Sequence, residues 1–238
     1  MTTQQNSNQS VREVVAVILL AGMGSRLGRP HPKSMTQLDD NQTILSRQLS
    51  TLRKHGLQIC CVVGFKKDLI MEEAADCLFV YNADYDCTNT SKSLLSALEH
   101  FKNKDVLWLN GDVVFDPQII DQILASDVST VAVNSARVAE EEIKYSLNDD
   151  GYISRISKQN TDAQGEAVGI NLIKQEWIER YCEKLRQVDD QDYFERAMEL
   201  LIDEAGNVFK PLDISELGCI EVDFEDDLAV AREMVKRL

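Results

Sequence analysis

Side chains of the kinds that bind phosphate and metal ions occur in a few short segments of this sequence. The segment VILLAGMGSRLGRPHPKS (residues 17–34) ends an apolar run in a glycine-rich loop that carries Arg26 and Lys33. Glycine lets backbone N–H groups approach a ligand closely, and neighbouring N–H groups can line a site for an anion. Arginine can pair two of its donors with phosphate oxygens, and lysine adds a second positive charge. The segment therefore predicts a site for a polyphosphate.

The glycine spacing separates this loop from two familiar phosphate-binding loops. The dinucleotide-binding fingerprint needs a third glycine three residues after Gly24, but Leu27 stands there and the glycine follows at Gly28. The Walker pattern needs a lysine directly after a glycine, and this loop has none. Two interpretations remain, namely a wider loop that wraps a triphosphate and a glycine turn whose basic residues are solvated.

Two aspartates follow short apolar runs and are candidate metal ligands. Asp112 lies in LNGDVVF (residues 109–115), and Asp223 lies in IEVDFEDD (residues 220–227). Ligands of open α/β sheets bind outside the carboxyl ends of the strands, where two carboxylates can hold one Mg²⁺ against phosphate oxygens. Either aspartate alone would be an ordinary loop or capping residue. Together with the glycine loop they predict a site for Mg²⁺ and a triphosphate.

The elements that must position these residues alternate along the chain. Apolar runs predict strands, and residues at helical spacing predict helices between them. The strands are expected at 14–20, 59–65, 78–82, 105–115, 129–135, 165–173 and 218–224, with a hairpin turning at Asp150–Gly151, and the helices at 43–56, 67–76, 91–101, 117–126, 175–187, 191–204 and 225–238. This alternation of strands and helices predicts a single three-layer α/β/α domain on a mainly parallel, mixed sheet.

Composition and charge narrow the function classes. The chain has 238 residues and a net charge of −15, which argues against a nucleic-acid-binding surface. No apolar run reaches the roughly 18 residues that span a bilayer, and the polar start resembles no signal peptide, so we expect a cytoplasmic protein with no membrane partner. Residues 1–12 are expected to be a disordered tail before a domain at 13–238. That domain divides into a nucleotide-binding half (about 13–115), an acceptor half (about 116–224) and a closing helix (225–238).

Several segments resemble one enzyme superfamily. The run LAGMGSRLG…PK is similar to the signature of nucleotidyltransferases of the sugar-phosphate and cytidylyltransferase type. YNADYDCTNTSKSLLSAL (residues 81–98) resembles a segment of phosphocholine cytidylyltransferase-like proteins, and matches to LNGDVVF, GEAVGI, DYFERAMELLI and CIEVDFEDDLAVA extend the resemblance over residues 14–235. The short spacing between Arg26 and Lys33 favours the cytidylyltransferase-like branches. The resemblance implies a Rossmann-like nucleotidyltransferase fold.

The resemblance also implies a reaction and a set of site residues. A nucleoside triphosphate and a phosphorylated acceptor would give a nucleoside-monophosphate-linked product and pyrophosphate. Arg26 and Lys33 would be the catalytic residues that hold the triphosphate, and Asp112 and Asp223 would bind Mg²⁺. The pocket for the base and ribose would contain Leu20, Ala21, Gly22, Met23, Gly24, Ser25, Asn89 and Ser93. The acceptor oxygen is already anionic, so positioning and electrostatics carry the chemistry and no strong base is needed.

The sequence specifies the acceptor-binding residues less closely than the residues of the nucleotide site. Phosphocholine and aminoethylphosphonate each carry a cation, which needs carboxylates or aromatic faces. Tyr193, Glu195 and Glu166 are candidates for that cation, and Lys144 is a candidate contact for the phosphate. The simpler alternatives are a core role for Tyr193 and Phe194, a solvated face for the acidic run at 140–142, and a lysine that only neutralises that run.

The leading hypothesis is a Mg²⁺-dependent cytidylyltransferase that transfers CMP from CTP to phosphocholine or a similar small phosphorylated alcohol or phosphonate. One alternative is a sugar- or polyol-phosphate nucleotidyltransferase that uses another nucleoside triphosphate. Another is a non-catalytic regulatory domain that binds a nucleotide. The sequence leaves the oligomeric state open, with a homodimer among the alternatives.

Overall fold

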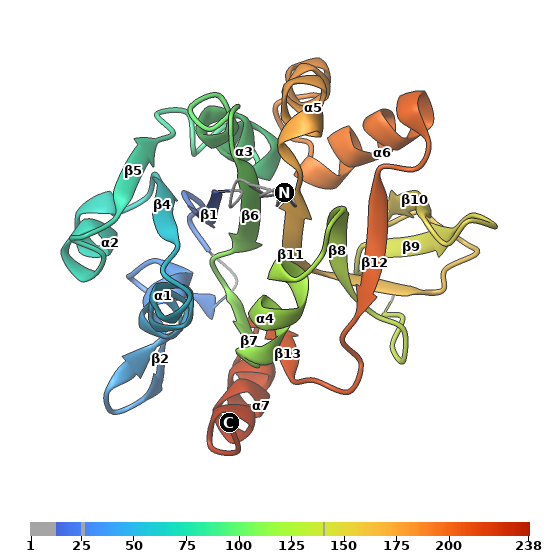
Figure 1. Cartoon of the computed structure of the whole chain (residues 1–238). Coiled ribbons are helices and arrows are strands. Elements are labelled where there is room, and N and C mark those ends of the chain that lie inside the picture. The colour runs from blue at the N-terminus through green and yellow to red at the C-terminus, as the bar shows by residue number, and fades with distance from the viewer. Residues whose placement is uncertain (1–12, 25–26, 140) are drawn as a thin grey trace, which may run out of the picture.

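The structure of this chain is a computed structural model that describes residues 13–24, 27–139 and 141–238, and a mixed β-sheet forms its centre (Figure 1). The strands of the sheet are β1 (Val14–Leu20), β4 (Gln58–Val63), β5 (Leu78–Tyr81), β6 (Asp105–Asn110), β8 (Ser129–Asn134), β9 (Lys144–Leu147), β10 (Ile153–Ser157), β11 (Gly165–Ile173) and β12 (Phe209–Asp213). They run in the order β10-β9-β11-β6-β1-β4-β5, and β8 joins β11 to β12. The predicted tail at 1–12 lies outside the described residues.

The first half of the sheet is parallel. In β1, Val17 pairs with Cys60 of β4 on one side and with Trp108 of β6 on the other. Apart from Val14 at its start, β1 is buried along its length. A strand covered on both faces reads as a continuous apolar run, which is why β1 was visible in the sequence. The strand β11 then runs antiparallel to β6, β8 and β9, which makes the sheet mixed.

Helices cover both faces of the sheet. Alternate residues of β1 point to opposite sides, with Val17 in one apolar cluster and Ile18 in the other. The first cluster includes residues of α3 (Thr90–Leu98), α5 (Gln175–Gln187) and α6 (Phe194–Ala205). The second includes residues of α1 (Ile44–Lys54), α2 (Lys67–Glu73) and α4 (Gln118–Leu124). The predicted single domain of three α/β/α layers is confirmed.

The predicted strand at 105–115 is wrong in one respect, because it breaks at Gly111–Asp112. The strand β6 ends at Asn110, and β7 (Val113–Phe115) leaves the sheet to pair antiparallel with β13 (Cys219–Glu221). At the break the Gly111 N–H donates to the Leu19 carbonyl at 3.1 Å, and a Cβ on Gly111 would lie 2.4 Å from Leu20 Cδ2. The predicted strand at 218–224 therefore belongs to a two-stranded ribbon and not to the main sheet.

The closing helix α7 (Glu225–Val235) packs beside this ribbon, apart from the other helices, where Figure 1 marks the C-terminus. Its Leu228 shares a third apolar cluster with Leu27 and Leu38, the latter from the small hairpin of β2 (Gln37–Asp39) and β3 (Gln42–Thr43).

The sequence did not predict β12, whose Pro211 is compatible with the parallel pairing to β8 at the margin of the sheet. Over the described ranges, every helix is too short or too polar to cross a bilayer.

Candidate active site

One cleft at the carboxyl ends of the parallel strands brings most of the predicted site residues together. It has a volume of about 1090 Å³ and lies between the loop after β1, the start of α3, the β6–β7 break, the β13–α7 connection and the start of α6. The predicted residues that line it are Leu20, Ala21, Gly22, Met23, Gly24, Lys33, Asn89, Ser93, Asp112, Glu166, Tyr193, Glu195 and Asp223. The predicted Ser25 and Arg26 lie outside the described residues.

Lys33 joins the two predicted aspartates. It begins a short 3-10 helix, η2 (Lys33–Met35), and its Nζ donates to Asp112 Oδ2 at 2.8 Å and also contacts Asp223. Only 12% of the lysine side chain is exposed, and burial works to lower its pKa. The charges and hydrogen bonds of Asp112 and Asp223 more than offset this and raise the pKa, so Lys33 remains an ammonium ion.

A third carboxylate, Glu221, completes an acidic cluster. One oxygen each from Asp112, Glu221 and Asp223 lies within 4.8 Å of the others. The pKa of Glu221 is raised, first by the charge of Asp112 and then by burial and the charge of Asp223. Glu221 was not among the metal ligands predicted from the sequence. Its two-residue spacing from Asp223 on an extended segment was the available signal, because alternate residues of a strand share a face.

This donor set fits a hard divalent cation. Asp112 Oδ1 is buried and has no hydrogen-bond partner among the described residues. Lys33 contacts Asp112 and Asp223, and the raised pKa of Glu221 reflects the crowding of negative charge around it. Oxygen ligands of this type suit Mg²⁺. The residues that could hold the ion are therefore Asp112, Glu221 and Asp223.

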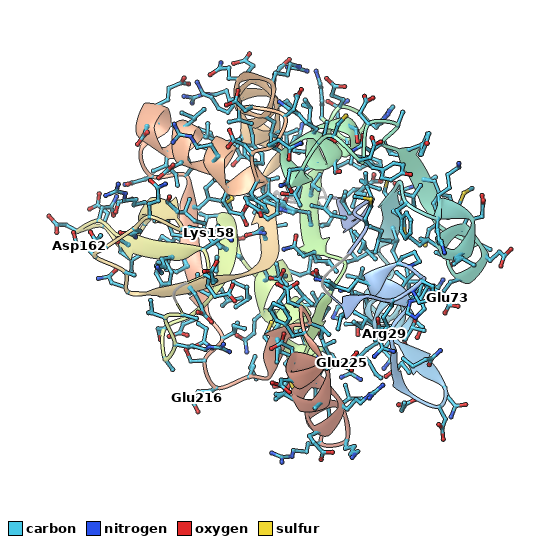
Figure 2. The ribbon with its side chains drawn as sticks, turned by 180° about the vertical axis from the view of Figure 1, so that it is seen from behind. Arg29, Glu73, Lys158, Asp162, Glu216 and Glu225 are labelled. Carbon is cyan, nitrogen blue, oxygen red and sulfur yellow. The ribbon has the colours of Figure 1, made fainter. Side chains whose placement is uncertain are left out.

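Backbone contacts hold the two aspartates side by side although they are far apart in the sequence. The Val222 N–H donates to the Asp112 carbonyl at 3.1 Å, which extends the pairing of β7 with β13. The Asp223 N–H donates to Asp227 Oδ2 at 3.1 Å, which ties it to the first turn of α7. Arg29 also pairs with Glu225 at 2.5 Å, and Figure 2 shows these two side chains meeting between the glycine loop and α7.

The glycine loop lies directly against Lys33. Gly24 has a φ of +57°, a backbone angle that residues with a Cβ atom rarely adopt. A Cβ on Gly24 would also lie 2.8 Å from Lys33 Cβ. The loop can therefore pass this close to the lysine only with glycine at this position.

The predicted nucleotide-pocket residues of α3 already have structural partners. The Asn89 side chain caps α3 by accepting from the Thr90 N–H at 2.8 Å, and its Nδ2 donates to the Gln191 carbonyl at 3.2 Å. Buried Ser93 accepts a hydrogen bond from Asn82 Nδ2 at 3.0 Å. These contacts fix the start of α3 at the cleft wall.

The opposite end of the cleft is acidic. Glu195, in the first turn of α6, is 8% exposed, and its Oε2 has no hydrogen-bond partner in the described part of the chain. Burial raises the pKa of Glu195 to about 7. Glu166 accepts from the Ala139 N–H at 3.0 Å and lies 3.7 Å from Arg137 Nε.

Two cations border this acidic end, and neither was predicted from the sequence. Arg137 follows β8 and Lys158 follows β10, so a basic residue just past a strand end was the signal that could have found each. The predicted Lys144 is not among the cleft-lining residues that the structure describes, and its Nζ donates to the Lys158 carbonyl at 3.2 Å. Because β9 pairs with β10, Lys144 lies beside the last residue of that neighbouring strand.

Comparison with known proteins gives matches along most of the chain. A family model described as a MobA-like NTP transferase domain matches residues 16–165. The chain is 29% identical to CMP-5'-(3-aminopropyl)phosphonate synthase of Streptomyces rubellomurinus, over 90% of this chain and 37% of that protein. It is 30% identical to the bifunctional protein GlmU of Methanococcus maripaludis, over 66% of this chain and 38% of that protein. The chain thus spans less than two fifths of the length of these relatives.

Solved structures share the fold. The CTP:phosphocholine cytidylyltransferase LicC of Streptococcus pneumoniae superposes with a TM-score of 0.73 at 21% identity, over 94% of this chain and all of that one. The inositol-1-phosphate CTP transferase of T. maritima superposes with a TM-score of 0.75 at 15% identity, over 94% of this chain and 96% of that one. The predicted nucleotidyltransferase fold is confirmed.

Proposed function

This chain belongs to the family of MobA-like NTP transferase domains, and from that premise we propose that it transfers CMP from CTP to a small phosphonate or phosphomonoester that carries a positive charge, with release of pyrophosphate. The observation that carries the proposal is the convergence of Lys33 with Asp112, Glu221 and Asp223 beside the glycine loop, in a cleft whose other end is acidic. The names of the phosphonate synthase and of LicC support cytidylyl transfer.

The glycine loop and its cations form the proposed triphosphate site. Lys33 already holds its ammonium at the cleft surface, and Arg26 of the same loop is proposed to act with it. Their charges would orient the triphosphate and stabilise the negative charge that develops on the departing pyrophosphate. Leu20, Gly22 and Met23 would flank the base and ribose. The cleft is lined from both proposed halves of the domain, with the nucleotide-binding half supplying this side.

The proposed metal is Mg²⁺, held by Asp112, Asp223 and Glu221. When bound, it would neutralise phosphate charge and make the α-phosphorus more electrophilic. The three carboxylates would fix the cation next to the glycine loop, because β7, β13 and the first turn of α7 hold them in place.

The transfer itself is a substitution at the α-phosphorus of CTP. An anionic oxygen of the acceptor forms the new P–O bond, and the bond to the β-phosphate oxygen breaks. The electron pair of that bond leaves with pyrophosphate. No proton has to be removed from the acceptor, so the work of the protein is to bring two anions together and hold them in line.

The acidic end of the cleft favours a cationic acceptor over a neutral sugar or polyol. Glu195 has an unpartnered oxygen there, and Glu142 and Glu166 add further negative charge. Arg137 and Lys158 supply two positive charges against these three carboxylates, so a neutral acceptor would leave part of the negative charge uncompensated. Positive charge on the acceptor would compensate it.

Pyrophosphate release over a panel of CTP, UTP, GTP, ATP and dTTP tests the proposal, with Mg²⁺ and an aminoalkylphosphonate as acceptor. We expect release with CTP well above that with the other four. A preference for another nucleoside triphosphate, or release from none of them, would contradict the proposal. The same panel with a sugar phosphate and with inositol phosphate tests the alternative acceptor classes.

A further inference from the structure

Glu195 has unused hydrogen-bonding capacity in the acceptor end of the cleft. The residue is 8% exposed, and its Oε2 is buried without a partner among the residues that the structure describes. A buried carboxylate oxygen that is neither paired nor hydrogen-bonded is costly to maintain. The N-terminus of the 12-residue helix α6 offsets part of this cost. Glu195 also lines the cleft, so its unpartnered oxygen lies in the cleft wall at this end.

Other charges show that Glu195 does not stand alone. The charge of Lys158 acts on both Glu195 and Glu142, and all three residues line the cleft. Burial and the charge of Glu166 raise the pKa of Glu142, which marks an excess of negative charge there. Lys158 itself is exposed, and its Nζ lies 5.1 Å from the centre of the Tyr193 ring. In Figure 2 it lies nearer the middle of the molecule than Asp162, at the border of the cleft.

Aromatic side chains at this end are not arranged to enclose a cation. Binding of a quaternary ammonium ion uses the faces of several aromatic rings, because that ion has no N–H to donate. Phe194 is buried against Trp108, with ring centres 5.6 Å apart, and Tyr193, which is 42% exposed, has the ammonium of Lys158 over its ring. Of the other aromatic residues lining the described cleft, Tyr85 lies against Gly64 beside the glycine loop and Phe224 caps α7.

Neither tryptophan of the chain supplies the missing face. Trp108 is fully buried in the core beneath α5 and α6. Trp177 is outside the cleft lining and stacks with Arg180, whose Cζ lies 5.1 Å from the ring centre. Among the described residues, the acceptor end therefore offers carboxylate oxygens to a cation and lacks a set of free ring faces.

We infer that the acceptor of the proposed reaction carries a primary ammonium group, received by Glu195, and that the cleft discriminates against a trimethylammonium group. This inference rests on the proposed cytidylyl transfer and names its substrate class, the short aminoalkyl phosphonates and phosphomonoesters. A primary ammonium ion has three N–H donors, which match the carboxylate oxygens of Glu195 and its neighbours. A trimethylammonium ion would bury Oε2 of Glu195 without giving it a hydrogen bond.

A matched acceptor series tests the inference with the full chain, CTP and Mg²⁺. The series is 2-aminoethylphosphonate, its N,N,N-trimethyl derivative and uncharged propylphosphonate. We expect kcat/KM for the primary amine to exceed that of each of the other two by about 100-fold, because a buried polar group left unpaired strongly penalises the wrong substrate. Equal or higher kcat/KM for the trimethyl derivative, or for propylphosphonate, would overturn the inference while leaving cytidylyl transfer intact. Pyrophosphate release with none of the three would contradict the proposed function and the inference together.

The variant Glu195→Gln tests the residue assigned to the ammonium group. It keeps the size of the side chain and removes its charge, so we expect KM for 2-aminoethylphosphonate to rise and the preference over propylphosphonate to fall by about 100-fold. The matched control is Glu199→Gln, one turn along α6, where Glu199 pairs with Arg196 outside the cleft lining. The control should keep the preference. A preference that is unchanged in folded Glu195→Gln would overturn the role of Glu195.

Discussion

The ammonium of Lys33 donates to Asp112 Oδ2 at 2.8 Å, across 79 residues of sequence. This contact joins the segment expected to hold the triphosphate to a carboxylate expected to hold the metal. Lys33 compensates the acidic cluster in the free protein, and a bound triphosphate would compete for the same ammonium while a cation takes its place beside Asp112.

Removing either aspartate of the cluster should abolish most of the turnover without unfolding the chain. For Asp112→Ala and Asp223→Ala we expect kcat to fall by about 10²–10³-fold, since each variant loses a ligand of the proposed Mg²⁺ that would neutralise the reacting phosphates. Circular dichroism should remain that of the parent. The surface variant Glu216→Ala is the control and should keep full kcat. Near-parental turnover in a folded Asp112→Ala protein would contradict the metal site.

Lys33 should stabilise the free protein as well as assist the reaction. In Lys33→Gln the three carboxylates lose their shared cation, and we expect the free energy of unfolding to fall by about 1–3 kcal/mol. Added Mg²⁺ should restore part of this loss. Urea unfolding with and without Mg²⁺ measures both effects. If the variant and the parent have the same free energy of unfolding without Mg²⁺, the charge of Lys33 does not stabilise the three carboxylates.

Gly24 should be needed for its lack of a side chain and not only for its backbone angle. Gly24→Ala places a methyl group 2.8 Å from Lys33 Cβ, so we expect kcat/KM for CTP to fall by about 10–100-fold as the lysine is displaced. Gly28→Ala is the matched control, because Gly28 has φ +61° and open space around its Cβ position. Both substitutions strain the backbone, and only the first displaces Lys33. Equal losses in the two variants would contradict this explanation.

The stability of the ligand-free protein should depend on pH through Glu195. Burial raises the pKa of this carboxyl to about 7, so between about pH 4.5 and 7 the folded state binds a proton that the unfolded state releases. The contribution of Glu195 to stability is therefore complete at low pH and is lost as the pH rises through 7. Lys158 opposes the shift by its positive charge, and Tyr181 of α5 also faces the group.

Glu195→Gln should remove this pH dependence. Relative to the parent, we expect the variant to gain on the order of 2–3 kcal/mol of stability between pH 5 and pH 8. Urea unfolding of both proteins at the two pH values gives the comparison, with Glu199→Gln as the control. A parent–variant difference that is the same at both pH values would show that Glu195 titrates normally.

The parts of the site that the sequence predicted are those with a strong local pattern. The glycine loop after β1 and the aspartates after two apolar runs each stand out in a short segment, and Lys33, Asp112 and Asp223 indeed meet. Asn89 and Ser93 were placed in the cleft by resemblance, and the structure finds them there. Arg26 stays a prediction.

The missed parts depend on contacts between distant segments. The break between β6 and β7 follows from the close approach of Gly111 to Leu20, which no local periodicity records. That break lets β7 pair with β13 and brings Glu221 beside Asp112. Likewise Lys144, expected in the acceptor site, is placed by the pairing of β9 with β10.

The most direct test of the central claim is ³¹P NMR of a reaction containing the full chain, CTP, Mg²⁺ and 2-aminoethylphosphonate. We expect a new phosphonate–phosphate anhydride, the CMP-linked product, and pyrophosphate in equal amounts. Both signals should disappear when Asp112→Ala replaces the parent protein. Unchanged CTP and phosphonate signals with the folded parent protein, or release of pyrophosphate without the linked product, would contradict the central claim.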